Sequence, residues 1–428
     1  MADELISYFR EAEVFSLRRR KREILFEANK LKSIKEEEVQ GISLRVIEDG
    51  KLGFSSSMGK YEPAQIIERA KDTLKLGIPA YMEFPGESSF EKVDIYDEKV
   101  MNMEDGRLID MGYEFIEKVR EKFPQITLYI RIDRGEIEVE IKNTRGLRAG
   151  YKKSFMSFSA EGVIVRGEDI LFVGDGEVSS SLPDIDLIYR EVMLQLDRAK
   201  RNVEIKSGRY PVIFSPHGVL SCFIPPLISA LNGKNVLKGS SPLSGRVGEV
   251  VFSREFTLID DPLVPLRAGT RPFDDEGVSS RRKFLIERGE VKGFLLDIRT
   301  AKRLGEEGAG NASRTILTLP SPSPSSLAVE EGGDDMESMI KNIKEGVLVE
   351  EVMGASQGNV MGGEFSGNIL LGYKIENGEV SGRVKDTMIS GNIYEALKDI
   401  VPGKGRRWVG SNLVPPILCP SLSISSRG

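Results

Sequence analysis

The chain has very few of the residues that build metal sites and disulfide frameworks. Its 428 residues include one histidine, His217, and two cysteines, Cys222 and Cys419. A catalytic zinc ion is usually held by three protein ligands, so a site built on two histidines is excluded. Two cysteines far apart in sequence do not make a Cys-rich zinc site. A composite site of His217, Cys222 and a carboxylate stays open, but a turn or interface histidine and a buried cysteine are favoured.

The sequence also has no long apolar run and no excess of positive charge. No run approaches the ~18 residues that span a bilayer, and the acidic start Met1-Ala2-Asp3-Glu4 lacks the features of a secretory signal. The net charge of −6 argues against a general nucleic-acid binder. One basic run, residues 18–22, is followed by the acidic residues 36–38, which favours a solvated face of mixed charge. These features predict a cytoplasmic protein that binds neither nucleic acid nor membrane directly.

The first half alternates between strand and helix patterns. The sequence Asp49-Gly50 between alternating apolar runs is a strong hairpin signal, and Pro63 marks the start of a helix that Gly77 ends. A turn is expected at residues 133–135. Helices are expected at residues 2–11, 63–77, 106–123 and 183–202. Strands are expected at residues 14–17, 23–26, 42–46, 52–54, 126–132, 137–141, 151–165 and 170–173.

After residue 204, glycine becomes frequent and helical patterns become scarce. The alternate prolines of residues 320–326 predict a surface loop or an extended segment. Strands are expected at residues 210–214, 248–252, 256–259, 284–287 and 291–296, and helices at 220–232, 300–305, 334–344 and 393–400. The patterns predict an α+β fold, with an α/β N-terminal domain at residues 1–203 and a β-rich C-terminal domain at residues 204–428.

Glycine and acidic residues in the second half offer several functional interpretations. The glycine-rich segments at 308–311 and 358–363 match neither common nucleotide-binding motif, so a nucleotide site is not expected. Turns explain most of the four Gly-Asn pairs, but they could instead line a cleft for an extended peptide. The acidic residues 260–261 and 274–276 could act as acid and base or bind a metal, although their neighbouring turns favour structural and interface roles. No Gly-x-Ser-x-Gly elbow surrounds a serine near His217, so a serine hydrolase is not expected.

Several segments resemble the TldD/PmbA (TldE) family. They are Lys238-Gly239-Ser240-Ser241, Gly245-Arg246-Val247-Gly248-Glu249, Asp260-Asp261-Pro262, Phe273-Asp274-Asp275-Glu276-Gly277, Gly308-Ala309-Gly310-Asn311 and Gly363-Glu364-Phe365-Ser366-Gly367. The catalytic branch of that family carries a His-Glu-x-x-x-His helix just before the Lys-Gly-Ser-Ser segment. By this resemblance the two histidine positions fall on Ile224 and Ser229, and the glutamate position falls on Pro225. The chain is therefore similar to the PmbA/TldE branch, which lacks the metal site.

The resemblance implies a subunit of a zinc metallopeptidase complex that processes or degrades peptides. This chain would hold no catalytic residue, metal or cofactor, the zinc would belong to a TldD-like partner subunit, and this chain would bind an extended peptide and complete the chamber. The alternative is a stand-alone homodimeric binding protein that modulates a gyrase-linked protein partner without proteolysis. Candidates for peptide binding or for a subunit interface are Asp274, Asp275, Glu276, Gly310, Asn311, Phe365, Ser366, Gly391 and Asn392.

Overall fold

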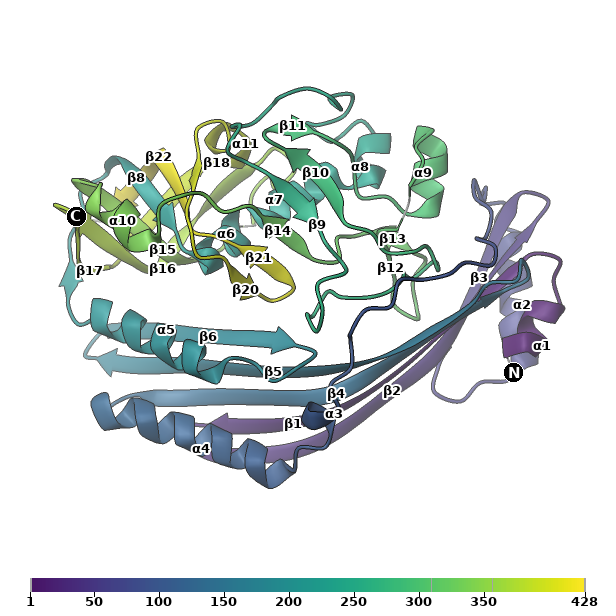
Figure 1. Cartoon of the computed structure of the whole chain (residues 1–428), viewed down its shortest axis with the longest axis horizontal. Helices are drawn as coiled ribbons and strands as arrows, with labels where there is room; N and C mark the ends of the chain where they lie inside the picture. Colours follow the sequence, from purple (N-terminus) through teal and green to yellow (C-terminus); the bar gives the residue numbers. More distant parts are fainter. Residues whose placement is uncertain (1, 309, 356, 427–428) are drawn as a thin grey trace.

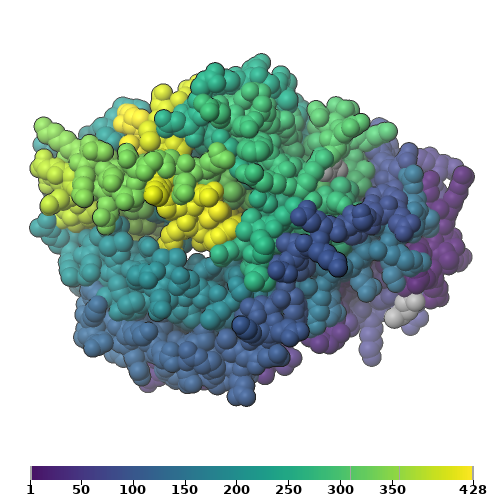
Figure 2. Space-filling model, in the orientation of Figure 1, coloured from purple at the N-terminus to yellow at the C-terminus, as the bar shows by residue number. Residues whose placement is uncertain are grey.

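The computed structural model describes residues 2–308, 310–355 and 357–426. Figure 1 shows two parts: a long twisted sheet from the first half of the chain, and a β-rich body from the second half that lies along it. The elements confirm an α+β fold. Figure 2 shows the second half, coloured green to yellow, packed along the teal and blue first half.

The first half forms one antiparallel sheet of long strands with the order β3-β2-β1-β4-β5-β6. Helices α4 and α5 share a hydrophobic core with the sheet, while α1 and α2 cover its far end near β3 (Figure 1). The strands are β1 (Ala12–Glu27), β2 (Lys30–Glu48), β3 (Lys51–Met58), β4 (Thr127–Asn143), β5 (Arg148–Arg166) and β6 (Asp169–Ser179). The helices are α1 (Ala2–Ser7), α2 (Pro63–Leu74), α3 (Glu98–Met101), α4 (Asp105–Lys122) and α5 (Ile185–Arg198).

Strand β1 is continuous, so the expectation of two strands around the basic run was wrong. Arg20, Lys21 and Arg22 lie opposite Glu38, Glu37 and Glu36 in β2, respectively. Each basic side chain forms an ion pair with the acidic residue across from it, at 3.3–3.5 Å. Opposite charges on directly paired residues stabilise a sheet. The expected face of mixed charge is confirmed, but it is part of the strand itself.

The turn expected at residues 133–135 was also wrong, because β4 runs straight through them. A side-chain carbon on Gly135 would lie 2.0 Å from the Arg20 carbonyl oxygen and 2.7 Å from the Phe155 ring. Glycine is needed there for a close approach of neighbouring strands rather than for a turn. The hairpin at Asp49-Gly50 is confirmed, and both residues have positive φ, 48° and 71°.

In the second half, five strands close into a ring, because β15 pairs with β8 on one side and β16 on the other. The ring strands are β8 (Gly208–Phe214), β15 (Glu345–Met353), β16 (Glu364–Glu376), β18 (Thr387–Asn392) and β22 (Ile417–Ser426), with β7 (Asn202–Val203), β17 (Glu379–Val384) and β19 (Val401–Pro402) attached. A second sheet contains β9 (Leu258–Asp260), β10 (Lys283–Glu287), β11 (Glu290–Val291), β14 (Leu327–Val329), β20 (Arg407–Val409) and β21 (Asn412–Val414), and β12 (Ala312–Ser313) pairs with β13 (Ser321–Pro322). The helices are α6 (Pro216–Cys222), α7 (Ile224–Leu231), α8 (Gly233–Leu237), α9 (Ile298–Leu304), α10 (Met336–Lys341) and α11 (Ile393–Ala396).

Four expectations for the second half need correction. The strand expected at 248–252 is irregular, with a single bridge between Val250 and Glu290, and the one at 291–296 shrinks to β11. The helix expected at 220–232 is two helices, α6 and α7, the second of which starts with prolines that lack an amide donor. The segment 320–326 is not a surface loop, and the alternative of an extended segment holds for β13, which pairs with β12. Its Ser325 and Ser326 are buried, and their amides donate to the Asp260 carboxylate.

The two halves share one hydrophobic core. Side chains of α4, α5, β4 and β5 pack in one cluster with Ile213, Leu348 and Tyr373 of the second half. The division of the chain at residue 203 remains a prediction. Within the described residues, no helix is both long enough and apolar enough to cross a membrane.

Candidate functional site

Helix α7 stands where the resemblance places the metal-binding helix. Ile224 is buried, and Pro225 has no amide hydrogen and begins the helix. The Ser229 hydroxyl lies 3.8 Å from the Met361 sulfur. A hydrocarbon side chain, a proline ring and one hydroxyl are not the histidine, cysteine or carboxylate ligands that zinc requires. The residues present on α7 do not fit a zinc ion.

The composite metal site left open by the sequence does not assemble either. Burial raises the pKa of the Cys222 thiol to about 12, so the thiol stays protonated at neutral pH and is a poor ligand. His217 forms a hydrogen bond with Asp175 instead. Across residues 2–308, 310–355 and 357–426, no three His, Cys, Asp or Glu side chains gather in a way that would hold a metal ion.

His217 lies in the first turn of helix α6 rather than in the turn expected after the strand, and it takes part in a buried charge cluster. Its Nε2 atom is 2.8 Å from Oδ1 of Asp175, whose Oδ2 accepts a hydrogen bond of 2.7 Å from Arg407. Burial alone would raise the pKa of Asp175, but the His217 hydrogen bond and the Arg407 charge hold it below its ordinary value. Burial would likewise lower the pKa of His217, but Asp175 outweighs it and the pKa is raised. The pair lines a cavity of about 490 Å³ between β5, β6, α6 and β15.

The His217–Asp175 pair predicts a pH-dependent contribution to stability. Because the pKa of His217 is raised in the folded state, the pair stabilises the fold fully when the pH is below the unfolded-state pKa of about 6.5. This stabilisation is lost as the pH rises through the folded-state pKa of His217. We expect His217→Gln to lower the free energy of unfolding by about 1–2 kcal/mol more at pH 5.5 than at pH 9. Urea unfolding at both pH values measures this difference. An equal loss at both would contradict a charged pair.

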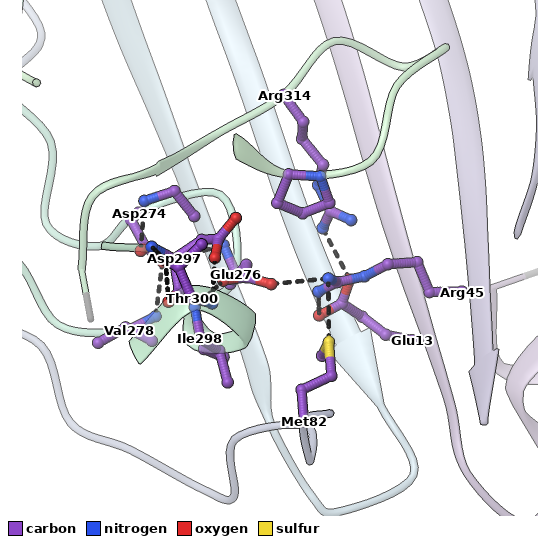
Figure 3. Close-up of polar contacts among 12 residues, drawn as sticks. Glu13, Arg45, Met82, Asp274, Glu276, Val278, Asp297, Ile298, Thr300 and Arg314 are labelled. Carbon is purple, nitrogen blue, oxygen red and sulfur yellow. Dashed lines mark hydrogen bonds and ion pairs between the residues drawn. The ribbon is translucent and has the colours of Figure 1, made fainter. Parts of the chain in front are cut away.

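The acidic turn 274–276 is buried, and the carboxylates of Asp274 and Glu276 bond inside the chain (Figure 3). Asp274 accepts hydrogen bonds from the amides of Glu276, Val278 and Ala312 at 2.9–3.0 Å. Asp275 accepts one of 2.8 Å from the Arg314 amide. These carboxylates fix the turn and the segment that follows β12. A contact of these residues with a peptide or a second subunit stays a prediction.

Glu276 joins the two halves of the molecule through Arg45 of β2 (Figure 3). Nη1 of Arg45 donates to Oε1 of Glu276 at 2.7 Å, and Nε and Nη2 donate to Glu13 at 2.9 and 2.8 Å. Arg314 donates a further bond of 2.8 Å to Glu13. Burial raises the pKa of Glu276 to about 7, although Arg45 opposes the shift. The acidic turn therefore forms part of the contact between the two halves of the chain.

The other candidate contacts lie in different places. Asn311 is buried, donates to Asp260 at 2.6 Å and accepts from Lys283 at 2.6 Å, while the adjacent Gly310 has a φ of 112° that suits glycine. Phe365 is 2% exposed and packs edge-on against Phe214, so a direct surface contact by its ring is ruled out in the single chain.

Only one of the remaining three candidates is freely exposed. Gly391 pairs with Phe365 across β16 and β18, and Asn392 caps α11 through the amides of Tyr394 and Glu395. Ser366 is exposed and remains a candidate for a peptide or subunit contact. Ala309 lies outside the described residues.

One similar protein aligns with most of this chain, and a second aligns with somewhat less than half of it. An uncharacterized protein of Methanocaldococcus jannaschii is 26% identical over 394 residues, which cover 88% of each chain. A metalloprotease of Archaeoglobus fulgidus is 33% identical over 202 residues, which cover 44% of this chain and 47% of that protein. The match to a protein named as a metalloprotease therefore spans about half of its length.

Solved structures match the whole fold. TldE from Thermococcus kodakarensis superposes with a TM-score of 0.88 at 26% identity, over 99% of both chains. A Thermotoga maritima protein described as a candidate modulator of a DNA gyrase has a TM-score of 0.90 at 24% identity, which shows a common fold. Residues 207–426 match the PmbA/TldA metallopeptidase C-terminal domain, and residues 12–74 match PmbA/TldA metallopeptidase domain 1. The chain belongs to the PmbA/TldA metallopeptidase family.

Proposed function

We propose that this chain is the non-catalytic, TldE-like subunit of a zinc metallopeptidase complex. The observation that carries the proposal is the chemistry of α7, where Ile224, Pro225 and Ser229 offer no zinc ligand and no general base. The similarity to TldE over the whole chain supports it. The zinc belongs to a TldD-like partner, and this chain holds an extended peptide and completes the chamber. The test is peptide cleavage by the chain alone and by its mixture with a TldD-like subunit.

On each edge strand of the N-terminal sheet, a side chain of the same chain covers the backbone of one residue, which favours the second half for peptide capture. On β6, the Gln195 amide accepts from the Gly174 amide at 2.8 Å and donates to its carbonyl at 3.0 Å. On β3, the Thr73 hydroxyl accepts from the Phe54 amide at 2.7 Å and lies 2.9 Å from its carbonyl. A free strand edge pairs readily with another chain, so covering these edges leaves the second half to receive an added strand.

A groove outside the ring of strands, lined by apolar, polar and charged side chains, is our candidate for the docking site of the TldD-like subunit. Ile170 of β6, Met353 of β15 and Met388 of β18 line it and are each more than two-fifths exposed. Grouped apolar side chains on a surface mark sites of protein contact. Methionine is frequent on such surfaces, because its flexible side chain adapts to a partner.

Met388→Asp is expected to weaken complex formation at least tenfold, because it places a charge in an apolar contact. The matched control is Met58→Asp on β3, since Met58 and Met388 are both 44% exposed. Light scattering and a titration of the TldD-like subunit against each variant measure the effect. Equal affinities for both variants would place the docking site elsewhere.

A further inference from the structure

A second cavity, of about 340 Å³, has a floor with two basic side chains. Arg19 of β1 pairs with Ile137 of β4, which pairs with Lys153 of β5. Residues directly opposite each other in a sheet point to the same face. Because adjacent strands are about 4.8 Å apart, the backbones of Arg19 and Lys153 are separated by about 10 Å. Their long side chains can therefore contact one small group between them.

Loops of the second half form the roof of this cavity and enclose Lys153. Its side chain donates to the carbonyl oxygens of Ala268 and Thr270, at 2.5 and 2.8 Å, and the residue is 8% exposed. An ammonium group has three donors, so one remains for a ligand. No carboxylate among the described residues pairs with Lys153.

Arg19 also lacks an acidic partner in the described part of the chain, unlike the other members of the basic run. Residues 18, 20, 21 and 22 each form an ion pair with a glutamate or aspartate. The Arg19 guanidinium instead lies 5.3 Å from the centre of the Phe155 ring, which also lines the cavity. A third basic residue, Arg271, is 3.6 Å from Asp275, so its charge is partly balanced.

The cavity thus holds two cations without counter-ions, one of them almost fully buried. Burying an unpaired charge is costly, and burial together with Arg271 lowers the pKa of Lys153 to about 7. An anion placed between Lys153 and Arg19 would form charge-assisted hydrogen bonds with both groups. Ile137 and Phe155 would cover the apolar part of the same ligand.

We propose that this cavity binds a carboxylate of an extended peptide, held between the Lys153 ammonium and the Arg19 guanidinium. The inference rests on the proposed function only in taking the ligand to be a peptide. The carboxylate is either the free C-terminus or the side chain of an aspartate or glutamate. The volume lies within the range of sites that enclose one small group.

Three versions of one unstructured fluorescent peptide test the proposal by anisotropy titration. One has a free C-terminus and no acidic residue, the second is amidated, and the third is amidated with one internal glutamate. We expect the first or the third to bind about tenfold more tightly than the second. Whichever of the two gains affinity identifies the source of the carboxylate.

Four variants test which side chains cause the preference for a carboxylate. Lys153→Met and Arg19→Gln should abolish the preference for a carboxylate. Lys152→Met and Arg20→Gln are matched controls that should keep it, because their side chains alternate to the opposite face and pair with Glu136 and Glu38. Arg19 is exposed, so Arg19→Gln keeps the test valid if Lys153→Met fails to fold.

The pH dependence of carboxylate affinity is a further test, because a purely structural role of Lys153 would not produce it. The charged or titratable groups that line the cavity with Lys153 are Arg19 of β1, Tyr151 of the same strand and Arg271 of the roof. The pKa of Lys153 is lowered to about 7, so carboxylate affinity should fall between pH 6 and pH 8 in the wild type and not in Lys153→Met.

Two results would overturn the inference, and they are distinguishable. Equal binding of all three peptides by wild type and variants, with cleavage by the reconstituted complex intact, rejects the carboxylate site and leaves the proposed function standing. Absence of both peptide binding and cleavage by the complex rejects the proposed function as well.

Discussion

Replacing Arg45 with methionine is expected to lower the free energy of unfolding by about 3–5 kcal/mol. Arg45 is 2% exposed and donates to Glu13 twice and to Glu276 once. Methionine fills similar space but leaves both carboxylates buried with fewer partners. An uncompensated buried charge is costly, so the loss should far exceed that of a surface ion pair. Because Glu276 belongs to the second half, the two halves should also separate more easily.

Urea unfolding of Arg45→Met beside Arg18→Met measures this effect. Arg18 forms an exposed pair with Glu38 at 2.8 Å that water screens, so its loss should be much the smaller of the two. The pKa of Glu276 is raised to about 7, so the folded state binds more protons than the unfolded state between about pH 4.5 and 7, and stability falls as pH rises there. Arg45→Met should therefore lose less stability at pH 5 than at pH 8. Equal, small losses in both variants would show that the buried network contributes little.

Local patterns predicted the parts of the fold that depend on neighbours in sequence. The Asp49-Gly50 hairpin and helix α2 follow directly from turn chemistry and apolar periodicity. In the sequence, the basic run and residues 133–135 each look like a break between strands. Like charges disfavour a strand in the basic run, and Gly135 disfavours one at residues 133–135. Both lie in strands because partners distant in sequence compensate: Glu36 to Glu38 for the charges, and the Arg20 backbone for Gly135. The buried Ser325 and Ser326 depend in the same way on Asp260.

The candidate site was only partly accessible from sequence. The resemblance correctly indicated the family, but no spacing rule connects His217 with Asp175, 42 residues away, or Asp175 with Arg407, 232 residues away. One signal for the basic cavity was available. Alternation places Lys153 on the same face as Tyr151 and Phe155, which is unusual for a solvated lysine. Phe365 is buried in the single chain, and the sequence could not show this, because an aromatic residue between glycine and serine can be either a core residue or a contact.

The largest expected effect on activity is the difference between this chain alone and its mixture with a TldD-like subunit. A metallopeptidase needs a metal-bound water whose pKa falls toward about 7, and α7 of this chain provides no ligand for the metal. We expect the chain alone to leave an unstructured peptide intact, and the mixture to cleave it. After dialysis, metal analysis should find stoichiometric zinc in the TldD-like subunit and not in this chain.

The controls separate a true complex from contamination. A TldD-like subunit whose motif histidines are replaced should not cleave in the mixture, although it should still bind this chain. Met388→Asp should reduce cleavage in proportion to the complex that is lost, while Met58→Asp should not.

The most direct measurement is the rate of peptide cleavage by this chain alone, with added zinc and with a chelator, next to the reconstituted mixture. The account predicts no cleavage by the chain alone under either condition, and chelator-sensitive cleavage by the mixture. Chelator-sensitive cleavage that scales with the concentration of this chain alone, and is lost on His217→Ala or Cys222→Ala, would contradict it.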